Sequence, residues 1–260
     1  VWDLFKLNDE AIRADIELIK SEKTFVEASS TNQILGEDIY IEEGAKVECA
    51  ILNTTSGPIY IAKGAEVMEG SILRGPIAVC ENGVVKMGAK IYGATTIGPY
   101  SKVGGEVNNC MIQGYSNKGH DGFLGNAVLG EWCNLGADTN NSNLKNNYQS
   151  VDIYNYNEEK YVDTELQFCG LIMGDHSKSA INTMFNTGTV IGVSANIYGA
   201  DFPSKFIPSY SWGGRKPLEY KFDKAMDTAK RVMDRRSIAL TENDLEILKH
   251  VYDESQKFRK

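Results

Sequence analysis

One histidine lies where the chain is richest in glycine and polar residues. His120 falls within residues 114–143, a stretch that also holds Lys118, Cys133 and Asn134. A neutral imidazole, with an ordinary pKa of about 6.5, can accept a proton near neutral pH, so His120 is a candidate general base. The alternative is a histidine that only forms a hydrogen bond at a loop corner. Cys133 could act as a nucleophile by residue type, but it lies beside a repeat position, so we expect it to pack in a core.

The remaining histidines and the cysteines offer weaker candidates. His176 lies at a repeat corner, where we expect a structural role, and His250 lies in a C-terminal helical segment. The cysteines are odd in number, widely spaced and without a CxxC pair, which argues against a disulfide framework and a zinc site. We therefore expect no metal and reduced thiols at Cys49, Cys80, Cys110, Cys133 and Cys169.

The elements that must position these residues are set by a six-residue period. Aliphatic side chains recur six apart, a spacing that fits neither a helix nor an alternating strand. Three such hexapeptides, each a short strand and a turn, close one eighteen-residue coil of a prism. The pattern predicts an all-β solenoid, a left-handed parallel β-helix. The period runs through Ile61, Val67, Leu73, Val79, Val85, Ile91, Ile97 and Val103, and resumes at Met173, Ser179, Phe185, Ile191 and Ile197.

The chain divides into three predicted parts. Residues 1–32 form a linker helix and lead-in, residues 33–200 the β-helix, and residues 201–260 a helical tail. The hexad register is broken between residues 104 and 172. Within this break, residues 144–167 form a tyrosine-rich insertion, predicted to be a projecting hairpin with Asn157 and Glu158 at its turn.

Flanking helices are predicted at both ends. The first places Leu4, Ile12, Ile16 and Ile19 on one face, with Asn8 as a candidate cap. In the tail, helical spacing relates Leu218, Phe222, Met226, Ala229 and Met233, and a second helix carries Leu245, Leu248, Val251 and Tyr252. A capping box at Thr241 and Asp244 begins that second helix. These helices cap the open solenoid end or, alternatively, help to close a site.

Composition excludes several function classes. The chain has 260 residues, 42% of them hydrophobic, with a net charge of -8 and a pI near 5.1. This charge argues against a surface for nucleic acid or anionic membrane. No apolar run approaches the roughly 20 residues of a membrane span, and no leader is recognisable, so we expect a cytoplasmic protein. Because the sequence begins at Val1, we expect it to be the C-terminal part of a longer protein.

Three linked motifs resemble a known family. They are His120-x-x-Phe123-Leu-Gly, then Asn134-Leu-Gly-Ala137-x-Thr, then Asn143. Over residues 1–215 the chain resembles the acetyltransferase half of the bifunctional glucosamine-1-phosphate acetyltransferase and N-acetylglucosamine-1-phosphate uridylyltransferase, GlmU, and its archaeal and Bacteroidetes-type relatives. The resemblance implies acetyl-CoA as co-substrate, an amino-sugar 1-phosphate as acceptor, a homotrimer, and a missing N-terminal nucleotidylyltransferase domain.

The resemblance also implies roles for individual residues. His120 takes the proton of the amine that attacks the thioester, while Asn134 and Asn143 lie beside the sugar. The backbone of Ala137 lies against the thioester, and amide groups near Gly136 stabilise the oxyanion. The alternative for both asparagines is structural, because asparagine suits left-handed backbone at β-helix corners.

Two positions depart from the family pattern and bear on the phosphate. Asn108 stands where relatives place a lysine, and Phe123 stands where bacterial members place a tyrosine. A sugar phosphate needs cationic donors, so a substitute must come from Arg74, Lys90 or Lys118, with Lys118 preferred.

Coenzyme A is expected in the groove between adjacent prisms. The resemblance places it beside corners that hold Asp175 and Gly192, with its phosphates near Lys205, Arg215 and Lys216.

Two functions from different classes follow. The first is an acetyl-CoA-dependent N-acetyltransferase that acts on an amino-sugar 1-phosphate, glucosamine-1-phosphate first, in nucleotide-sugar synthesis. The second is a non-catalytic trimerisation scaffold for a sugar-1-phosphate nucleotidylyltransferase. Asn108 and Phe123 favour the scaffold, whereas His120, Asn134 and Asn143 favour the enzyme.

Overall fold

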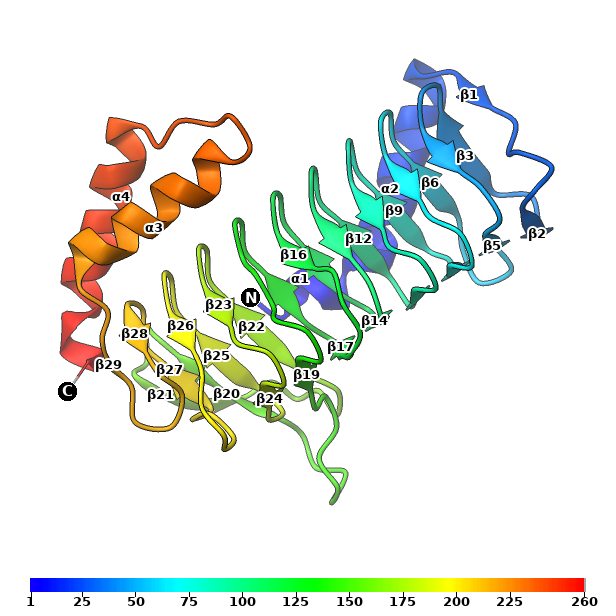
Figure 1. Cartoon of the computed structure of the whole chain (residues 1–260). Helices are drawn as coiled ribbons and strands as arrows, with labels where there is room; N and C mark the ends of the chain where they lie inside the picture. Colours follow the sequence, from blue (N-terminus) through cyan, green and yellow to red (C-terminus); the bar gives the residue numbers. More distant parts are fainter. Residues whose placement is uncertain (260) are drawn as a thin grey trace.

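The computed structural model describes residues 1–259 and is a solenoid built from three ladders of short strands (Figure 1). Apart from antiparallel strands at either end, neighbouring strands of each ladder are parallel, and the architecture is that of a left-handed parallel β-helix. Sheet A contains β1 (Phe25–Val26), β3 (Ile39–Glu42), β6 (Ile59–Ile61), β9 (Ile77–Val79), β12 (Thr95–Ile97), β15 (Met111–Ile112), β18 (Val128–Leu129), β22 (Leu171–Met173), β25 (Thr189–Ile191) and β27 (Phe206–Ile207).

The other two faces of the prism are sheets B and C. Sheet B contains β2 (Gln33–Leu35), β5 (Ile51–Asn53), β8 (Ile72–Arg74), β11 (Lys90–Tyr92), β14 (Glu106–Asn108) and β17 (Phe123–Gly125), and β19 (Asn140–Asn141) and β24 (Met184–Phe185) continue it. Sheet C contains β4 (Lys46–Val47), β7 (Glu66–Val67), β10 (Val84–Val85), β13 (Lys102–Val103) and β16 (Asn117–Lys118). A bridge at Asn134 leads on to β23 (Lys178–Ser179), β26 (Asn196–Ile197), β28 (Ser211–Trp212) and β29 (Leu218–Glu219).

The hexad residues form the core of the prism, as predicted. Ile61 pairs with Val79 and Val79 with Ile97, so residues eighteen apart stack in adjacent coils. All eight residues of the first run are at most 2% exposed, and those of the second run are also buried. Each fully buried aliphatic side chain contributes about 1.5–3 kcal/mol, which explains why the period is kept so strictly.

A shortened corner explains why the period fails after Val103. Two residues, 104 and 105, join β13 to β14, whereas four residues, 119–122, join the paired strands β16 and β17 one coil later. This corner removes two residues from the coil, and a third is lost between β14 and β15, since Ile91 pairs with Val107 but Ile97 with Ile112. Val103 therefore pairs with Lys118, fifteen residues on instead of eighteen.

The solenoid continues beyond residue 200, where the hexad pattern placed its end. Strand β27 pairs with β25, and Asn196 pairs with Trp212, both in parallel. The predicted boundary is wrong by about one coil. Residues 198–205 lack a sheet B strand in this last coil, so the six-residue count is lost there although two faces persist.

The predicted N-terminal helix packs on sheet A. Helices α1 (Asp3–Lys6) and α2 (Asn8–Glu22) are present, and Ile12 and Ile16 are buried against sheet A. Asn8 is not a cap: its Nδ2 donates to Ala94 O at 2.8 Å, and its Oδ1 accepts from Thr96 Oγ1 at 2.9 Å. Leu4 was also misassigned to the buried face. It is 42% exposed, while its neighbour Phe5 is buried.

The C-terminal helices cover the last coil (Figure 1). Helices α3 (Phe222–Asp234) and α4 (Glu242–Glu254) are followed by the short 3-10 helix η1 (Ser255–Phe258). Tyr210 of the last coil is fully buried beneath Met226 and Leu248, and the capping box of Thr241 and Asp244 is confirmed. Leu218 lies outside the helices, in β29, and is 73% exposed.

The predicted hairpin is confirmed, with Asn157 and Glu158 at its turn between β20 (Asp152–Asn155) and β21 (Lys160–Asp163). It packs against sheet A of its own chain, where Val151 and Ile153 share a cluster with residues of the sheet.

Within residues 1–259, no helix is long and apolar enough to cross a membrane, and no group of histidine, cysteine and acidic side chains is arranged to hold a metal ion.

Candidate active site

His120 lies at the corner where sheet C turns into sheet B. Its side chain is exposed in the turn of residues 119–122. That turn rests directly on the shortened corner of the preceding coil. Asp121 O accepts a hydrogen bond from Asp138 N of the next coil at 3.1 Å. The histidine is thus held by backbone contacts from both neighbouring coils while its ring faces solvent.

The glycines of the shortened corner allow this close approach. Gly105 has a φ of +68°, and an added Cβ would lie 2.8 Å from Asp121 Cα and 2.9 Å from His120 O. Because both contacts are backbone atoms, neither can move aside without shifting the turn that carries His120.

We therefore expect Gly105→Ala to lower stability by more than 1 kcal/mol and to lower turnover as well. The matched control is Gly88→Ala, one coil earlier at the same corner. Gly88 has a φ of +67° but no atom within 4 Å of an added Cβ, so it tests the backbone conformation alone. Thermal unfolding and turnover measurements on both variants test whether Gly105→Ala is the more harmful change. Equal losses of turnover in Gly105→Ala and Gly88→Ala would contradict the expectation.

The other histidines differ from His120 in setting. His176 stacks on Trp132 with ring centroids 6.2 Å apart and planes 9° from parallel. Its Nδ1 is buried and has no hydrogen-bond partner among residues 1–259, and burial lowers the pKa of the ring to about 4. His250 is exposed on α4, away from the corner of His120. Of the three histidines, it is therefore His120 whose ring is exposed at a corner of the β-helix.

Ala137 and Asn134 lie one coil beyond His120. Ala137 occupies the same corner as His120, and its carbonyl accepts from Asn182 N at 2.8 Å. Gly136 N already donates to Ser179 O at 3.1 Å, so of the predicted oxyanion donors Ala137 N is the better candidate. Asn134 lies around the corner on sheet C, where its Oδ1 accepts from Asn117 Nδ2 at 2.9 Å.

Three predicted substrate residues meet on sheet B. The Phe123 ring and Asn143 Nδ2 both contact the space above Gly125, and Asn108 pairs with Gly125 in the ladder. Asn143 Nδ2 also donates to Asn126 Oδ1 at 2.7 Å. His120 lies before β17 and Asn143 lies beyond its far end, so the outer surface of this strand connects them.

Lys118 does not lie on the surface. It is 2% exposed, and its Nζ donates to Gly104 O at 2.9 Å and to His120 O at 2.6 Å. The prediction that Lys118 binds the phosphate is therefore wrong. Its side chain takes a core position in sheet C and points into the prism.

The four predicted coenzyme residues fall at two different corners. Ala137 and Arg215 lie at the corner of His120. Arg215 follows β28 near the C-terminal end of the solenoid, and its Nη1 lies 3.2 Å from Asp201 Oδ2. Asp175 and Gly192 lie at the corner between sheets A and C, where Asp175 Oδ1 accepts from Glu131 N at 2.8 Å. The structure does not bring these two pairs together.

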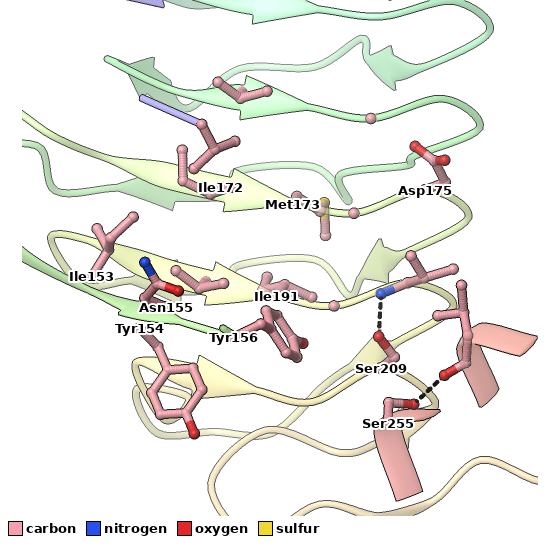
Figure 2. A pocket seen from close by; sticks show the side chains of 18 of the residues that line it. Ile153, Tyr154, Asn155, Tyr156, Ile172, Met173, Asp175, Ile191, Ser209 and Ser255 are labelled. Carbon is pink, nitrogen blue, oxygen red and sulfur yellow. Dashed lines mark hydrogen bonds between the residues drawn. The ribbon is translucent and has the colours of Figure 1, made fainter. Parts of the chain in front are cut away.

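Asp175 and Gly192 instead border a cavity of about 800 Å³ on the outer side of sheet A (Figure 2). The hairpin, the C-terminal helices and the N-terminal residues Val1, Trp2 and Leu4 form its other walls. Most of the lining is apolar, including Ile153, Ile172 and Val190. No pattern in the sequence predicts this cavity, although the tyrosine-rich insertion that covers it is visible there as a break in the repeat.

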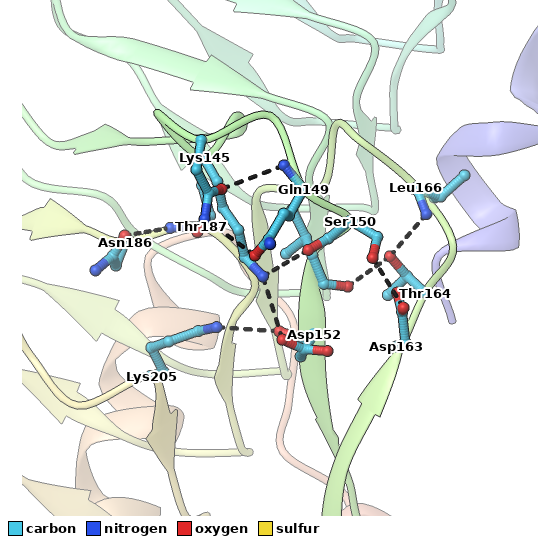
Figure 3. Close-up of polar contacts among 12 residues, drawn as sticks. Lys145, Gln149, Ser150, Asp152, Asp163, Thr164, Leu166, Asn186, Thr187 and Lys205 are labelled. Carbon is cyan, nitrogen blue, oxygen red and sulfur yellow. Dashed lines mark hydrogen bonds and ion pairs between the residues drawn. The ribbon is translucent and has the colours of Figure 1, made fainter.

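Polar contacts anchor the hairpin over this face (Figure 3). Lys145 Nζ donates to Ser150 O at 2.5 Å and to Asp152 Oδ2 at 3.2 Å. Lys205 Nζ donates to Asp152 O at 3.1 Å. Lys205, predicted to meet coenzyme phosphates, is thus engaged at the base of the hairpin.

Cys133 is a core residue, as predicted. It is 2% exposed, and burial raises the pKa of its thiol to about 12, so it carries no thiolate at neutral pH. We expect Cys133→Ala to keep turnover within about twofold of the wild type. In native protein, iodoacetamide should label the exposed Cys49 and spare Cys133, as measured by peptide mass spectrometry. Rapid labelling of Cys133 with loss of turnover would contradict this.

Comparison with known proteins agrees with the resemblance read from the motifs. No family model matches the chain. The bifunctional protein GlmU of Synechococcus elongatus is 24% identical over 220 residues, which are 79% of this chain and 44% of the relative. GlmU of Methanococcus aeolicus is 33% identical over 87 residues, 34% of this chain and 20% of that relative. The chain thus spans less than half the length of the curated relatives it matches.

Among solved structures, a UDP-N-acetylglucosamine acyltransferase of Francisella novicida covers 86% of this chain and 78% of its own, with 11% identity and a TM-score of 0.47. The fold itself follows from the three parallel ladders and the six-residue spacing of the buried side chains, which make the protein a left-handed β-helix of hexapeptide repeats. Its sequence is GlmU-like, with similarity that extends over most of the chain.

Proposed function

We propose that this chain is an acyltransferase domain that moves an acetyl group from acetyl-CoA to the amine of an amino-sugar 1-phosphate, glucosamine-1-phosphate first. The observation that carries the proposal is the exposed ring of His120 on a corner turn, next to Ala137 and joined by β17 to Asn143. The similarity to GlmU supports the same reaction.

The chemistry requires one base. The amine nitrogen attacks the thioester carbonyl, His120 takes the proton released from that nitrogen, and the amide forms as the carbon–sulfur bond breaks. The imidazolium then protonates the departing thiolate, so His120 returns to its neutral form. Ala137 N stabilises the oxyanion, and Asn143 orients the sugar.

The acyl donor would lie along the corner that begins at His120. From Ala137 this corner passes Ile181, 68% exposed, and Tyr198, 45% exposed, before it reaches Arg215. Three coil steps of about 4.8 Å give about 14 Å, which suits an extended pantetheine arm along apolar side chains. Arg215 would then meet the phosphates, and Asp175 and Gly192 would take no part.

Lys90 replaces Lys118 as the proposed phosphate ligand. It is exposed on sheet B in the column that runs from Lys90 through Glu106 to Phe123. Two coil steps of about 4.8 Å place it about 10 Å from Phe123, within reach of a lysine side chain and a sugar phosphate. Arg74 lies one coil farther, and its Nε donates to Ser56 Oγ at 3.3 Å.

A homotrimer would complete the site. Asn134 and Asn143 lie on different sides of the prism, so one chain does not direct both at the same sugar. A neighbouring prism that packs against the corner of His120 would supply the second asparagine. We also propose that the chain is part of a longer protein with an N-terminal nucleotidylyltransferase domain, because the matched GlmU relatives are more than twice as long as the aligned segment. The proposed location of this protein is the cytoplasm.

Thiol release from acetyl-CoA tests the function, with glucosamine-1-phosphate and galactosamine-1-phosphate as the first acceptors. Turnover that needs both the acetyl-CoA and an amino sugar is expected. A folded trimer without turnover on any amino sugar would favour the alternative, a scaffold for the nucleotidylyltransferase. Asn108 and Phe123, which lack the family's lysine ammonium and tyrosine hydroxyl, are the residues that favour that alternative.

A further inference from the structure

Lys118 occupies a position that packing alone would give to an aliphatic residue. It pairs with Val103, which pairs with Val85, and these valines are fully buried in the same column of sheet C. A lysine here costs free energy, because its ammonium leaves water and, in the part of the chain that the structure describes, no carboxylate lies at bonding distance. A residue that breaks the core pattern in this way points to a requirement other than stability.

The contacts of its Nζ show what that requirement is. The Nζ of Lys118 donates to Gly104 O at 2.9 Å and to His120 O at 2.6 Å, and these two carbonyl groups belong to adjacent coils. The turn around His120 has little side-chain packing of its own, since Gly119 and Gly122 flank it and Gly104 and Gly105 lie beneath it. Hydrogen bonds therefore set its position.

We propose that Lys118 is a positioning residue, which fixes the turn of residues 119–122 from inside the prism and so places the imidazole of His120 for proton transfer. This inference rests on the proposed function for its catalytic consequence. The position of the turn itself does not depend on it.

The test compares Lys118→Met with Lys178→Met. Methionine keeps the volume and removes the donors. Lys178 is the matched control, because it is half-buried and its Nζ donates to His176 O at 2.8 Å, at the corner between sheets A and C. In Lys118→Met we expect kcat to fall about 10- to 100-fold with little change in the KM for acetyl-CoA, as a displacement of about 1 Å would produce. Lys178→Met should keep kcat within about twofold.

A double-mutant cycle separates positioning from general damage. In a His120→Ala background, Lys118→Met should cause no further loss of kcat, because the group it positions is already absent. A further 10-fold loss, or a single variant with wild-type kcat, would overturn the proposal.

A readout without activity keeps the two proposals distinguishable. The chain has three histidines, so imidazole NMR signals can be assigned to each. In Lys118→Met the His120 signal should broaden or split, while those of His176 and His250 stay unchanged. An unchanged His120 signal would overturn the positioning role. Wild-type turnover in His120→Ala would instead overturn the proposed function.

Discussion

Replacement of His120 by alanine is expected to lower kcat by about 10²- to 10⁴-fold, the usual loss when a general base is removed. The amine must lose its proton as it attacks the thioester. Without the imidazole, only water near the corner can accept it. Within residues 1–259 the exposed ring of His120 makes no hydrogen bond, so its removal should leave the melting temperature within a few degrees of the wild type.

The comparison needs a histidine that is exposed but outside the site. His250→Ala provides it, because that ring lies on α4, and its turnover should match the wild type. Stopped assays of thiol release at saturating acetyl-CoA, over pH 6 to 9, compare the two variants. A His120→Ala enzyme with unchanged kcat would remove His120 from the mechanism.

The sequence predicted the fold well wherever the coil length was constant. Residues eighteen apart stack, so a buried position repeats in the sequence and its aliphatic residues are visible without a structure. The two-residue corner at Gly104 and Gly105 shifts this count, and the twenty-four-residue insertion at 144–167 shifts it again. Beyond each shift, spacing alone no longer identifies which corner a residue occupies. Asp175 and Gly192, for example, lie at the corner between sheets A and C, whereas Ala137 lies at the corner of His120.

Side-chain direction was the second limit. Lys118 was preferred as the phosphate ligand, a role that needs an exposed ammonium. Its spacing contained the contrary signal, since Ile112, Lys118 and Leu124 stand six apart, and the two aliphatic residues are at most 1% exposed. By contrast, the spacing is regular between His120 and Ala137, which lie at one corner because the turns 119–122 and 136–139 have equal length and stack one coil apart.

The burial of Lys118 predicts a specific dependence of stability on pH. Burial lowers the pKa of Lys118 from 10.5 to about 8 in the folded protein. Between these values the folded state binds fewer protons than the unfolded state, so the contribution of Lys118 to stability rises with pH. This lowering of the pKa corresponds to about 3 kcal/mol, at about 1.36 kcal/mol for each pH unit.

Buried thiols act in the opposite direction, so the wild type alone cannot display this effect. Burial raises the pKa of Cys110 and of Cys133 to about 12, and the stability they contribute is lost as pH rises above 9. Lys118→Met contains the same thiols but not the ammonium. Urea unfolding of both proteins at pH 7 and pH 10 should show the wild type gaining about 2–3 kcal/mol relative to the variant. A stability difference that stays constant with pH would mean that the Lys118 ammonium is not desolvated in the folded protein. The proposal that buried Lys118 holds the turn of His120 in place would then be contradicted.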